Sequence, residues 1–217
     1  MSAHSLKLLR QVWLVLGTAL LLAACSEQPA YDALPRGTTV LAFGDSVTYG
    51  TGARQGEDYP SLLAQLSGWE IVNAGIPGDT AQEAKQRIEQ ALQETLPTLV
   101  IIELGGNDFL RRRSEGEVKE DLREIVRAVK TAGAQPVLVA VPRVSLLGAA
   151  AGALSDSAIY RELAEEEQVP LIEKVFSKVL SDDALRADRV HPNAEGYRVL
   201  TEGFAQALAE IGLLARP

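Results

Sequence analysis

Residues 38–46 read TTVLAFGDS, and this stretch predicts a strand that ends at a polar turn. Its first six residues are mostly β-branched or apolar, which favours an extended strand buried on both of its faces. Gly44 ends the apolar run, and Asp45 and Ser46 follow it directly. In open α/β sheets ligands bind beyond the carboxyl ends of the strands, so polar residues at this point are candidates for a functional site.

The rest of the chain alternates short apolar runs with segments of helical periodicity. Further strands are predicted at residues 70–72, 99–104, 136–141 and 170–172, and helices at 59–66, 80–95, 117–131, 157–168 and 199–211. Thr80 and Glu83 have the spacing of a capping box at the start of their helix. Strands that are apolar throughout are buried on both faces. The pattern therefore predicts an α/β fold, a three-layer αβα sandwich with a five-stranded parallel sheet.

The composition is that of a globular domain and excludes several classes of protein. Hydrophobic residues make up 47% of the 217, enough to offset the entropy of ordering the chain, so a disordered protein is excluded. The formal net charge of −8 would repel phosphate, and aromatic residues are only 5% of the chain, so we expect no nucleic-acid partner. A single cysteine rules out an internal disulfide and cysteine-based zinc clusters.

The first 24 residues have the order of a secretory signal peptide. Lys7 and Arg10 give a basic start, an apolar run follows from Val12 to Leu22, and two alanines close the segment. The run is shorter than the roughly 20 residues that a spanning helix needs. We therefore expect cleavage, with an uncleaved amino-terminal anchor as the alternative.

Residues 22–25 read LAAC and resemble the lipobox of bacterial lipoproteins, in which the cysteine becomes the lipid-modified first residue. Cys25 is the chain's only cysteine, and an incidental cysteine at this place is the alternative. The resemblance implies a cell-envelope lipoprotein held to the membrane through lipidated Cys25, and Ser26 favours the outer membrane, facing the periplasm. The expected organisation is a signal peptide at 1–24, a lipidated tether at 25–37 and one folded domain at 38–217.

Three short polar segments follow predicted strands, at residues 44–46, 75–79 and 105–108. Each alone could be an ordinary turn, because glycine, aspartate, serine and asparagine are common turn residues. Since the carboxyl ends of parallel strands lie along one edge of a sheet, we expect the three segments to border one crevice. A fourth segment, DRVHP at 188–192, contains His191, the only histidine that remains once the signal peptide is removed.

Taken in order, these segments resemble the motifs of the GDSL or SGNH hydrolases. The matching blocks are Gly44-Asp45-Ser46, Gly75 to Thr80, Gly105-Gly106-Asn107-Asp108 and Asp188-Arg189-Val190-His191-Pro192. The resemblance covers nearly all of the chain after residue 37 and is closest to the thioesterase I, lysophospholipase L1 and arylesterase type. It implies the flavodoxin-like SGNH-hydrolase fold and no cofactor. Val47 replaces the family's leucine, and we expect it to pack behind the serine.

The residue types also fit acyl transfer. A serine hydroxyl becomes a nucleophile when a base removes its proton, and imidazole is the side chain suited to this near neutral pH. We therefore predict Ser46 as nucleophile and His191 as base. Asp188 lies three residues earlier, so a short loop can place its carboxylate on the second imidazole nitrogen. The family resemblance implies an oxyanion hole formed by the backbone N–H groups of Ser46 and Gly78 and the Asn107 amide.

Four carboxylates fall near the same crevice, at Asp45, Asp79, Glu103 and Asp108. We expect them to organise the loops rather than to react. A metal site would need converging ligands, and one histidine with scattered carboxylates does not supply them. We therefore expect neither a metal nor another cofactor.

The apolar, glycine- and alanine-rich stretch at 144–154 lies between a strand and a helix. In related enzymes this region borders the acyl pocket, so the resemblance implies that Val144, Leu146 and Leu147 bind substrate; a loop with no ligand role is the alternative. The predicted function is a serine esterase that forms an acyl-enzyme from aryl or alkyl esters of short to medium acyl chains. Lysophospholipids and thioesters are further candidates, and no obligate protein partner is inferred.

Two other functions stay open. A carbohydrate or peptidoglycan O-acetylesterase would use the same catalytic residues with a polar pocket, and the apolar stretch at 144–154 argues against it. A non-catalytic envelope lipoprotein that binds a ligand on this fold is the other alternative. Loss of a catalytic or oxyanion residue would favour it, and none is missing from the sequence.

Overall fold

The computed structural model describes residues 31–143 and 154–215. Five strands form a single parallel sheet in the order β2-β1-β3-β4-β5. Their bounds are Thr39–Gly44 for β1, Glu70–Gly75 for β2, Leu99–Glu103 for β3, Gln135–Val139 for β4 and Leu171–Ile172 for β5. The predicted five-stranded parallel sheet is confirmed.

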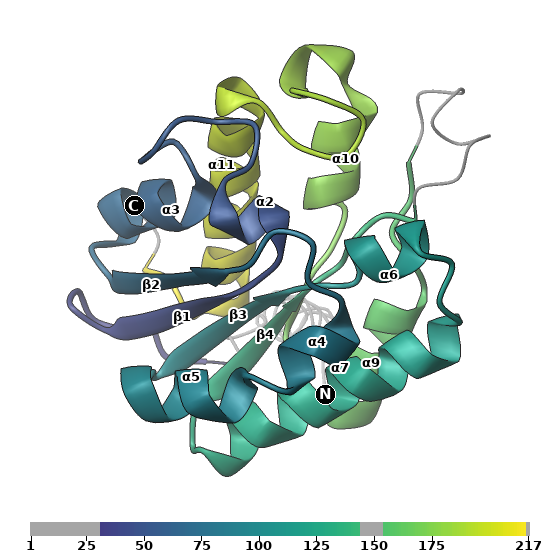
Figure 1. Ribbon diagram of the computed structural model, residues 1–217. Coiled ribbons are helices and arrows are strands. Elements are labelled where there is room, and N and C mark those ends of the chain that lie inside the picture. The colour runs from purple at the N-terminus through teal and green to yellow at the C-terminus, as the bar shows by residue number, and fades with distance from the viewer. Residues whose placement is uncertain (1–30, 144–153, 216–217) are drawn as a thin grey trace, which may run out of the picture. The chain divides into compact units, whose positions relative to one another are not determined.

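Helices cover both faces of the sheet (Figure 1). They are α2 (Ser46–Tyr49), α3 (Tyr59–Ser67), α4 (Ala81–Lys85), α5 (Ile88–Thr95), α6 (Gly106–Leu110), α7 (Glu115–Thr131), α9 (Ile159–Glu167), α10 (Val175–Ser181) and α11 (Ala194–Ile211), with a 3₁₀ turn η1 at Asp183–Leu185. α3 and α11 pack together on one face, while α4, α5 and α9 pack against α7 on the other. The three-layer αβα sandwich is therefore confirmed. In the ranges that the structure describes, no helix combines the length and apolarity needed to cross a bilayer.

The core lies along the central strands. In β1 the side chains from Val40 to Phe43 are fully buried, and β3 is buried along its whole length. β2 differs from the expectation that every strand is covered on both faces, because Val72 is 41% exposed. The reason is its position: β2 is an edge strand that pairs only with β1.

The helix predicted at 80–95 is two helices, so this prediction is wrong in part. Thr80 and Glu83 do form the expected capping box at the start of α4. The helix ends at Lys85, and α5 begins at Ile88. Between them the Arg87 guanidinium donates to the carbonyl oxygens of Gly44 and Ala74 at the ends of β1 and β2. The break places this side chain at the edge of the sheet where the strands end.

Candidate active site

Ser46 follows β1 at a tight turn and is the first residue of α2. The Asp45 side chain caps this short helix, because its Oδ1 accepts a hydrogen bond from the Val47 N–H at 3.1 Å. A Cβ atom on Gly44 would lie 2.0 Å from Oγ1 of Thr48, so only glycine fits the turn. Val47 is 3% exposed and packs in the core behind the serine, as predicted. The turn leaves the Ser46 side chain half-buried at the edge of the sheet.

His191 and Asp188 lie beside Ser46. Nε2 of His191 is 2.9 Å from the Ser46 hydroxyl oxygen, and Nδ1 is 2.7 Å from Oδ2 of Asp188. The other oxygen of Asp188 accepts hydrogen bonds from the N–H groups of Val190 and His191. Partial burial acts to raise the pKa of Asp188, but these hydrogen bonds and the His191 ring outweigh it and lower the pKa below its ordinary value. An ionised carboxylate is therefore held against the imidazole.

The loop that carries His191 is held by the loop that follows α2, a contact that sequence reasoning missed. Tyr197 on α11 donates its hydroxyl hydrogen to the Thr51 carbonyl at 2.9 Å. A Cβ atom on Gly52 would lie 2.3 Å from the Pro192 carbonyl oxygen. Gly52 has a φ of +97°, so both its conformation and its surroundings require glycine. In the sequence, the closely spaced glycines Gly50 and Gly52 could have indicated that this loop approaches another segment of the chain closely.

Of the three predicted oxyanion donors, Ser46 and Asn107 line one cavity, whereas Gly78 is not among the residues that line it. Asn107, on α6, donates one amide hydrogen to Oδ2 of Asp45 at 3.0 Å and the other to the Asp79 carbonyl at 2.9 Å. Within the part of the chain that the structure describes, the N–H groups of Ser46 and Gly78 have no protein acceptor. Gly78 has a φ of +89°, a conformation that glycine adopts without strain. Asn107 is thus held by its neighbours Asp45 and Asp79.

Two buried carboxyl groups lie behind the serine. Burial raises the pKa of Asp45 to about 6, although the Val47 N–H and nearby His191 act to lower it. Burial and the neighbouring Asp45 raise the pKa of Glu103 well above its ordinary value. One Glu103 oxygen accepts from the Thr48 hydroxyl at 2.9 Å. Oδ1 of Asp45 lies 3.5 Å from the Ser46 hydroxyl oxygen, farther than Nε2 of His191, so His191 is the nearer proton acceptor.

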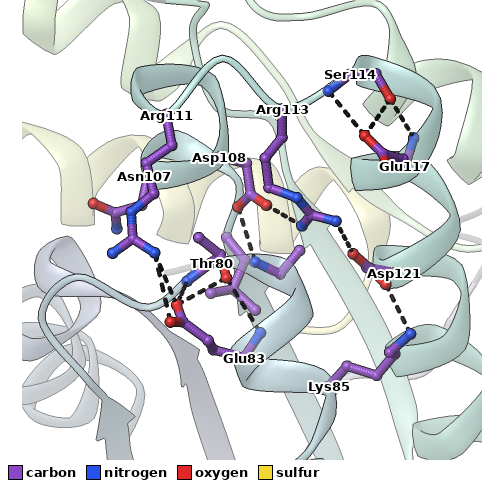
Figure 2. A network of polar contacts seen from close by, with 12 residues as sticks. Thr80, Glu83, Lys85, Asn107, Asp108, Arg111, Arg113, Ser114, Glu117 and Asp121 are labelled. Atoms are coloured by element: carbon purple, nitrogen blue, oxygen red, sulfur yellow. Dashed lines mark hydrogen bonds and ion pairs between the residues drawn. The ribbon is translucent and has the colours of Figure 1, made fainter.

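Asp108 joins α6 to the start of α4 (Figure 2). Its Oδ2 accepts from the Ala81 N–H at 2.8 Å, and its Oδ1 accepts from Arg113 at 2.6 Å. Arg113 also contacts Asp121 on α7 at 2.8 Å. Asp108 therefore fixes the helix that carries Asn107 to the segment that follows the Gly78 loop, which agrees with the expectation that it organises loops.

A cavity of about 130 Å³ lies beside Ser46 and reaches Asn107 and His191. Its apolar wall consists of Leu110, Val141, Pro142, Phe176, Leu180 and Val190. Phe176 and Leu180 lie on α10, a helix that was not predicted from the sequence. Their four-residue spacing is typical of one face of a helix and could have indicated it. The predicted substrate residues Val144, Leu146 and Leu147 lie outside the described residues, as does Cys25. No metal-binding group of three or more His, Cys, Asp or Glu occurs within 31–143 and 154–215.

Known proteins resemble this chain in sequence and in fold. The GDSL-like Lipase/Acylhydrolase family matches residues 42–199. A "Thioesterase 1/protease 1/lysophospholipase L1" of Escherichia coli (strain K12) is 34% identical over 173 residues, which cover 78% of this chain and 83% of the relative. An "Arylesterase" of Vibrio mimicus is 30% identical over 177 residues, 79% and 88% of the two chains. The crystal structure of AlinE4, an SGNH-hydrolase family esterase, has a TM-score of 0.63 at 30% identity and covers 82% of this chain and 98% of its own.

Proposed function

The chain belongs to the GDSL-like lipase/acylhydrolase family and is a carboxylic ester hydrolase, and on this premise we propose that it acts through an acyl-Ser46 intermediate. The observation that carries the proposal is the contact of 2.9 Å between the Ser46 hydroxyl and Nε2 of His191. The Asp188 carboxylate on the opposite nitrogen favours the tautomer whose Nε2 is free to accept a proton.

In this mechanism His191 removes the Ser46 proton as the serine oxygen attacks the acyl carbon. The substrate carbonyl oxygen becomes an oxyanion, which the N–H groups of Ser46 and Gly78 and the Asn107 amide stabilise. His191 then passes its proton to the leaving alkoxide, and the acyl group stays on Ser46. A water molecule that His191 deprotonates attacks the acyl-enzyme, releases the acid and restores the serine.

Asn107 contributes by redirecting a hydrogen bond. In the structure both of its amide hydrogens are bonded, to Asp45 and to the Asp79 carbonyl. The proposed backbone donors, the N–H groups of Ser46 and Gly78, have no acceptor among the described residues. Asn107 adds its donor as negative charge develops, so its effect falls on the transition state more than on the bound substrate.

The proposed substrates are esters with short to medium acyl chains. The apolar wall beside Ser46 suits an acyl chain, because burying hydrocarbon there removes apolar surface from water. This wall argues against an acetylated sugar, which needs polar partners. The name of the Escherichia coli relative adds thioesters and lysophospholipids as candidates. A panel of chromogenic esters of increasing acyl length, with an acetylated sugar beside it, tests the choice; faster turnover of the sugar would favour an O-acetylesterase.

The nucleophile is tested with a fluorophosphonate probe and the Ser46→Ala variant. The wild type should react with the probe and hydrolyse p-nitrophenyl butyrate. The variant should do neither, because deletion of a triad nucleophile lowers the rate by about 10⁴–10⁶-fold. Circular dichroism and melting temperature confirm that the variant is folded. Undiminished hydrolysis by folded Ser46→Ala would overturn the mechanism, and an unreactive wild type would favour a binding lipoprotein.

The LAAC sequence at 22–25 and the Ser26 that follows it support a second part of the proposal, that the protein is anchored to the outer membrane through lipidated Cys25. Two or more acyl chains hold a protein to a membrane stably, and salt does not weaken an apolar anchor. The wild type should therefore stay with the membrane fraction after a high-salt wash, and Cys25→Ser should not be lipidated. Recovery of the wild type entirely in the soluble periplasmic fraction would contradict the anchor.

A further inference from the structure

Arg87 makes three hydrogen bonds beneath the candidate oxyanion hole. Its Nε contacts Oδ2 of Asp79 at 2.7 Å, and its two terminal nitrogens donate to the carbonyl oxygens of Ala74 at 3.0 Å and Gly44 at 2.9 Å. The guanidinium carbon also lies 4.1 Å from the centre of the Phe43 ring. The side chain is 20% exposed, so these contacts are largely shielded from water.

One of these contacts reaches the turn that carries the nucleophile. The Gly44 carbonyl belongs to the peptide that leads into Asp45, one residue before Ser46. It accepts hydrogen bonds from Arg87 and from the N–H of Ile76, the residue that follows β2. The position of the Ser46 N–H is therefore tied to the arginine through a single intervening residue.

The contact with Asp79 reaches the other two donors. Asp79 directly follows Gly78, whose N–H is the second candidate oxyanion donor. The carbonyl oxygen of Asp79 accepts from the Asn107 amide at 2.9 Å. Arg87 thus holds Asp79 through the Asp79 carboxylate. Asp79 in turn follows one donor, Gly78, and its carbonyl group orients another, the Asn107 amide.

We propose that Arg87 is a positioning residue that sets the spacing of the three oxyanion donors by joining the Ser46 turn to the Gly78–Asp79 loop; this inference rests on the proposed esterase function. A planar guanidinium can hold a carboxylate and two carbonyl groups at fixed angles, whereas a lysine ammonium is a single point charge on a flexible stem. Arg87 itself does not line the cavity beside Ser46, so it acts through Gly44 and Asp79.

The test compares Arg87→Ala and Arg87→Lys with Arg123→Ala. Arg123 is a matched control, because its side chain is 14% exposed and it pairs with Glu120, Glu166 and Glu167 in the α7–α9 layer. Hydrolysis of p-nitrophenyl butyrate should show a kcat about 10²-fold lower in Arg87→Ala, with KM changed by less than about threefold, because misplaced donors weaken transition-state binding. The kcat of Arg87→Lys should lie between those of the wild type and Arg87→Ala, and the kcat of Arg123→Ala should stay within about twofold of the wild-type value.

Added guanidinium ion at millimolar concentration should raise the kcat of Arg87→Ala by about tenfold and leave the wild type unchanged, an effect that a loss of stability alone would not give. Asp79→Asn, which keeps the backbone and removes the charge, should lower kcat by about tenfold. The proposal is overturned if Arg87→Ala has the same kcat as Arg123→Ala, or if its KM rises while its kcat stays at the wild-type value. It is also overturned if the activity of Arg87→Ala falls in proportion to the fraction of folded protein and added guanidinium does not restore it. Should Arg87→Ala not fold, an unchanged kcat in Asp79→Asn overturns it. Failure of the esterase function is distinct, since it would appear as an inactive wild type.

Discussion

The Ser46 hydroxyl oxygen lies 2.9 Å from Nε2 of His191, although 145 residues separate the two in sequence. The ring is fixed from its other side by Asp188, whose carboxylate is 54% exposed yet accepts three hydrogen bonds from the 190–191 segment. The imidazole therefore has one orientation, with its free nitrogen toward the serine.

Replacing Asp188 by Asn should leave the protein folded and lower kcat by up to about 10⁴-fold, because an amide no longer enforces the reactive tautomer or stabilises the imidazolium. Ester hydrolysis near neutral pH measures the effect. Asp183→Asn is the control, since Asp183 is an 88% exposed carboxylate close in sequence that does not contact His191. Equal activity of the two variants would show that Asp188 does not orient the ring.

Asn107→Ala should lower kcat by roughly 10²–10³-fold, the usual effect of removing one oxyanion donor. KM should move much less, because the donor acts mainly on the transition state. The variant should also melt at a lower temperature, because buried Asp45 loses a hydrogen-bond donor. Steady-state kinetics and thermal melts separate these effects. A rise in KM alone would mean that Asn107 binds substrate in its ground state.

Gly52→Ala should displace the loop that carries His191, because the new Cβ would lie 2.3 Å from the Pro192 carbonyl oxygen. Gly56→Ala is a matched control: Gly56 also has a positive φ, +85°, but a Cβ there meets nothing within 4 Å. Both variants should lose about 1–2 kcal/mol of stability from the backbone conformation. Only Gly52→Ala should also lose at least about tenfold in kcat. Equal kcat in the two would show that the contact does not position His191.

The sheet was predictable because its central strands β1 and β3 are apolar along most of their length, as expected for a parallel sheet covered on both faces. The break at Arg87 was not predictable. Residues 80–95 have helical periodicity, but the Arg87 side chain bonds to carbonyl groups at the ends of β1 and β2, and this tertiary demand overrides local propensity. The exposure of β2 likewise depends on strand order, which its own residues do not encode.

The candidate site was predictable in its residue types and not in its connections. Serine, histidine and aspartate in the matching order identified Ser46, His191 and Asp188, and the fold then placed them within hydrogen-bond distance. The double engagement of Asn107 with Asp45 and the Asp79 carbonyl requires the exact register of two loops on adjacent strands. Motif spacing carries no information about that register.

Asp45 should make the stability of the fold depend on pH between about 4 and 6. Burial raises its pKa in the folded protein from 3.8 to about 6, so the folded state holds the Asp45 proton more tightly than the unfolded state does. As the pH rises through this window the unfolded chain ionises first, and stability falls; above about pH 6 both states are ionised and the effect is constant. The rise in the pKa of Asp45 from 3.8 to about 6 corresponds to a change of at most about 3 kcal/mol in the free energy of unfolding.

The test is the free energy of unfolding in urea at pH 4, 5, 6 and 7 for the wild type and for Asp45→Asn, which cannot ionise. Titrating groups that do not interact with Asp45 cancel in the difference between the two proteins, whereas Glu103, whose pKa Asp45 raises, contributes to that difference. The wild type should lose stability relative to Asp45→Asn by up to about 3 kcal/mol from pH 4 to pH 6, with little change from 6 to 7. Asp183→Asn, at an 88% exposed carboxylate, should follow the wild type throughout. Parallel curves for the wild type and Asp45→Asn would show that Asp45 ionises in the folded protein as readily as in the unfolded chain, and that burial behind Ser46 does not hold its proton.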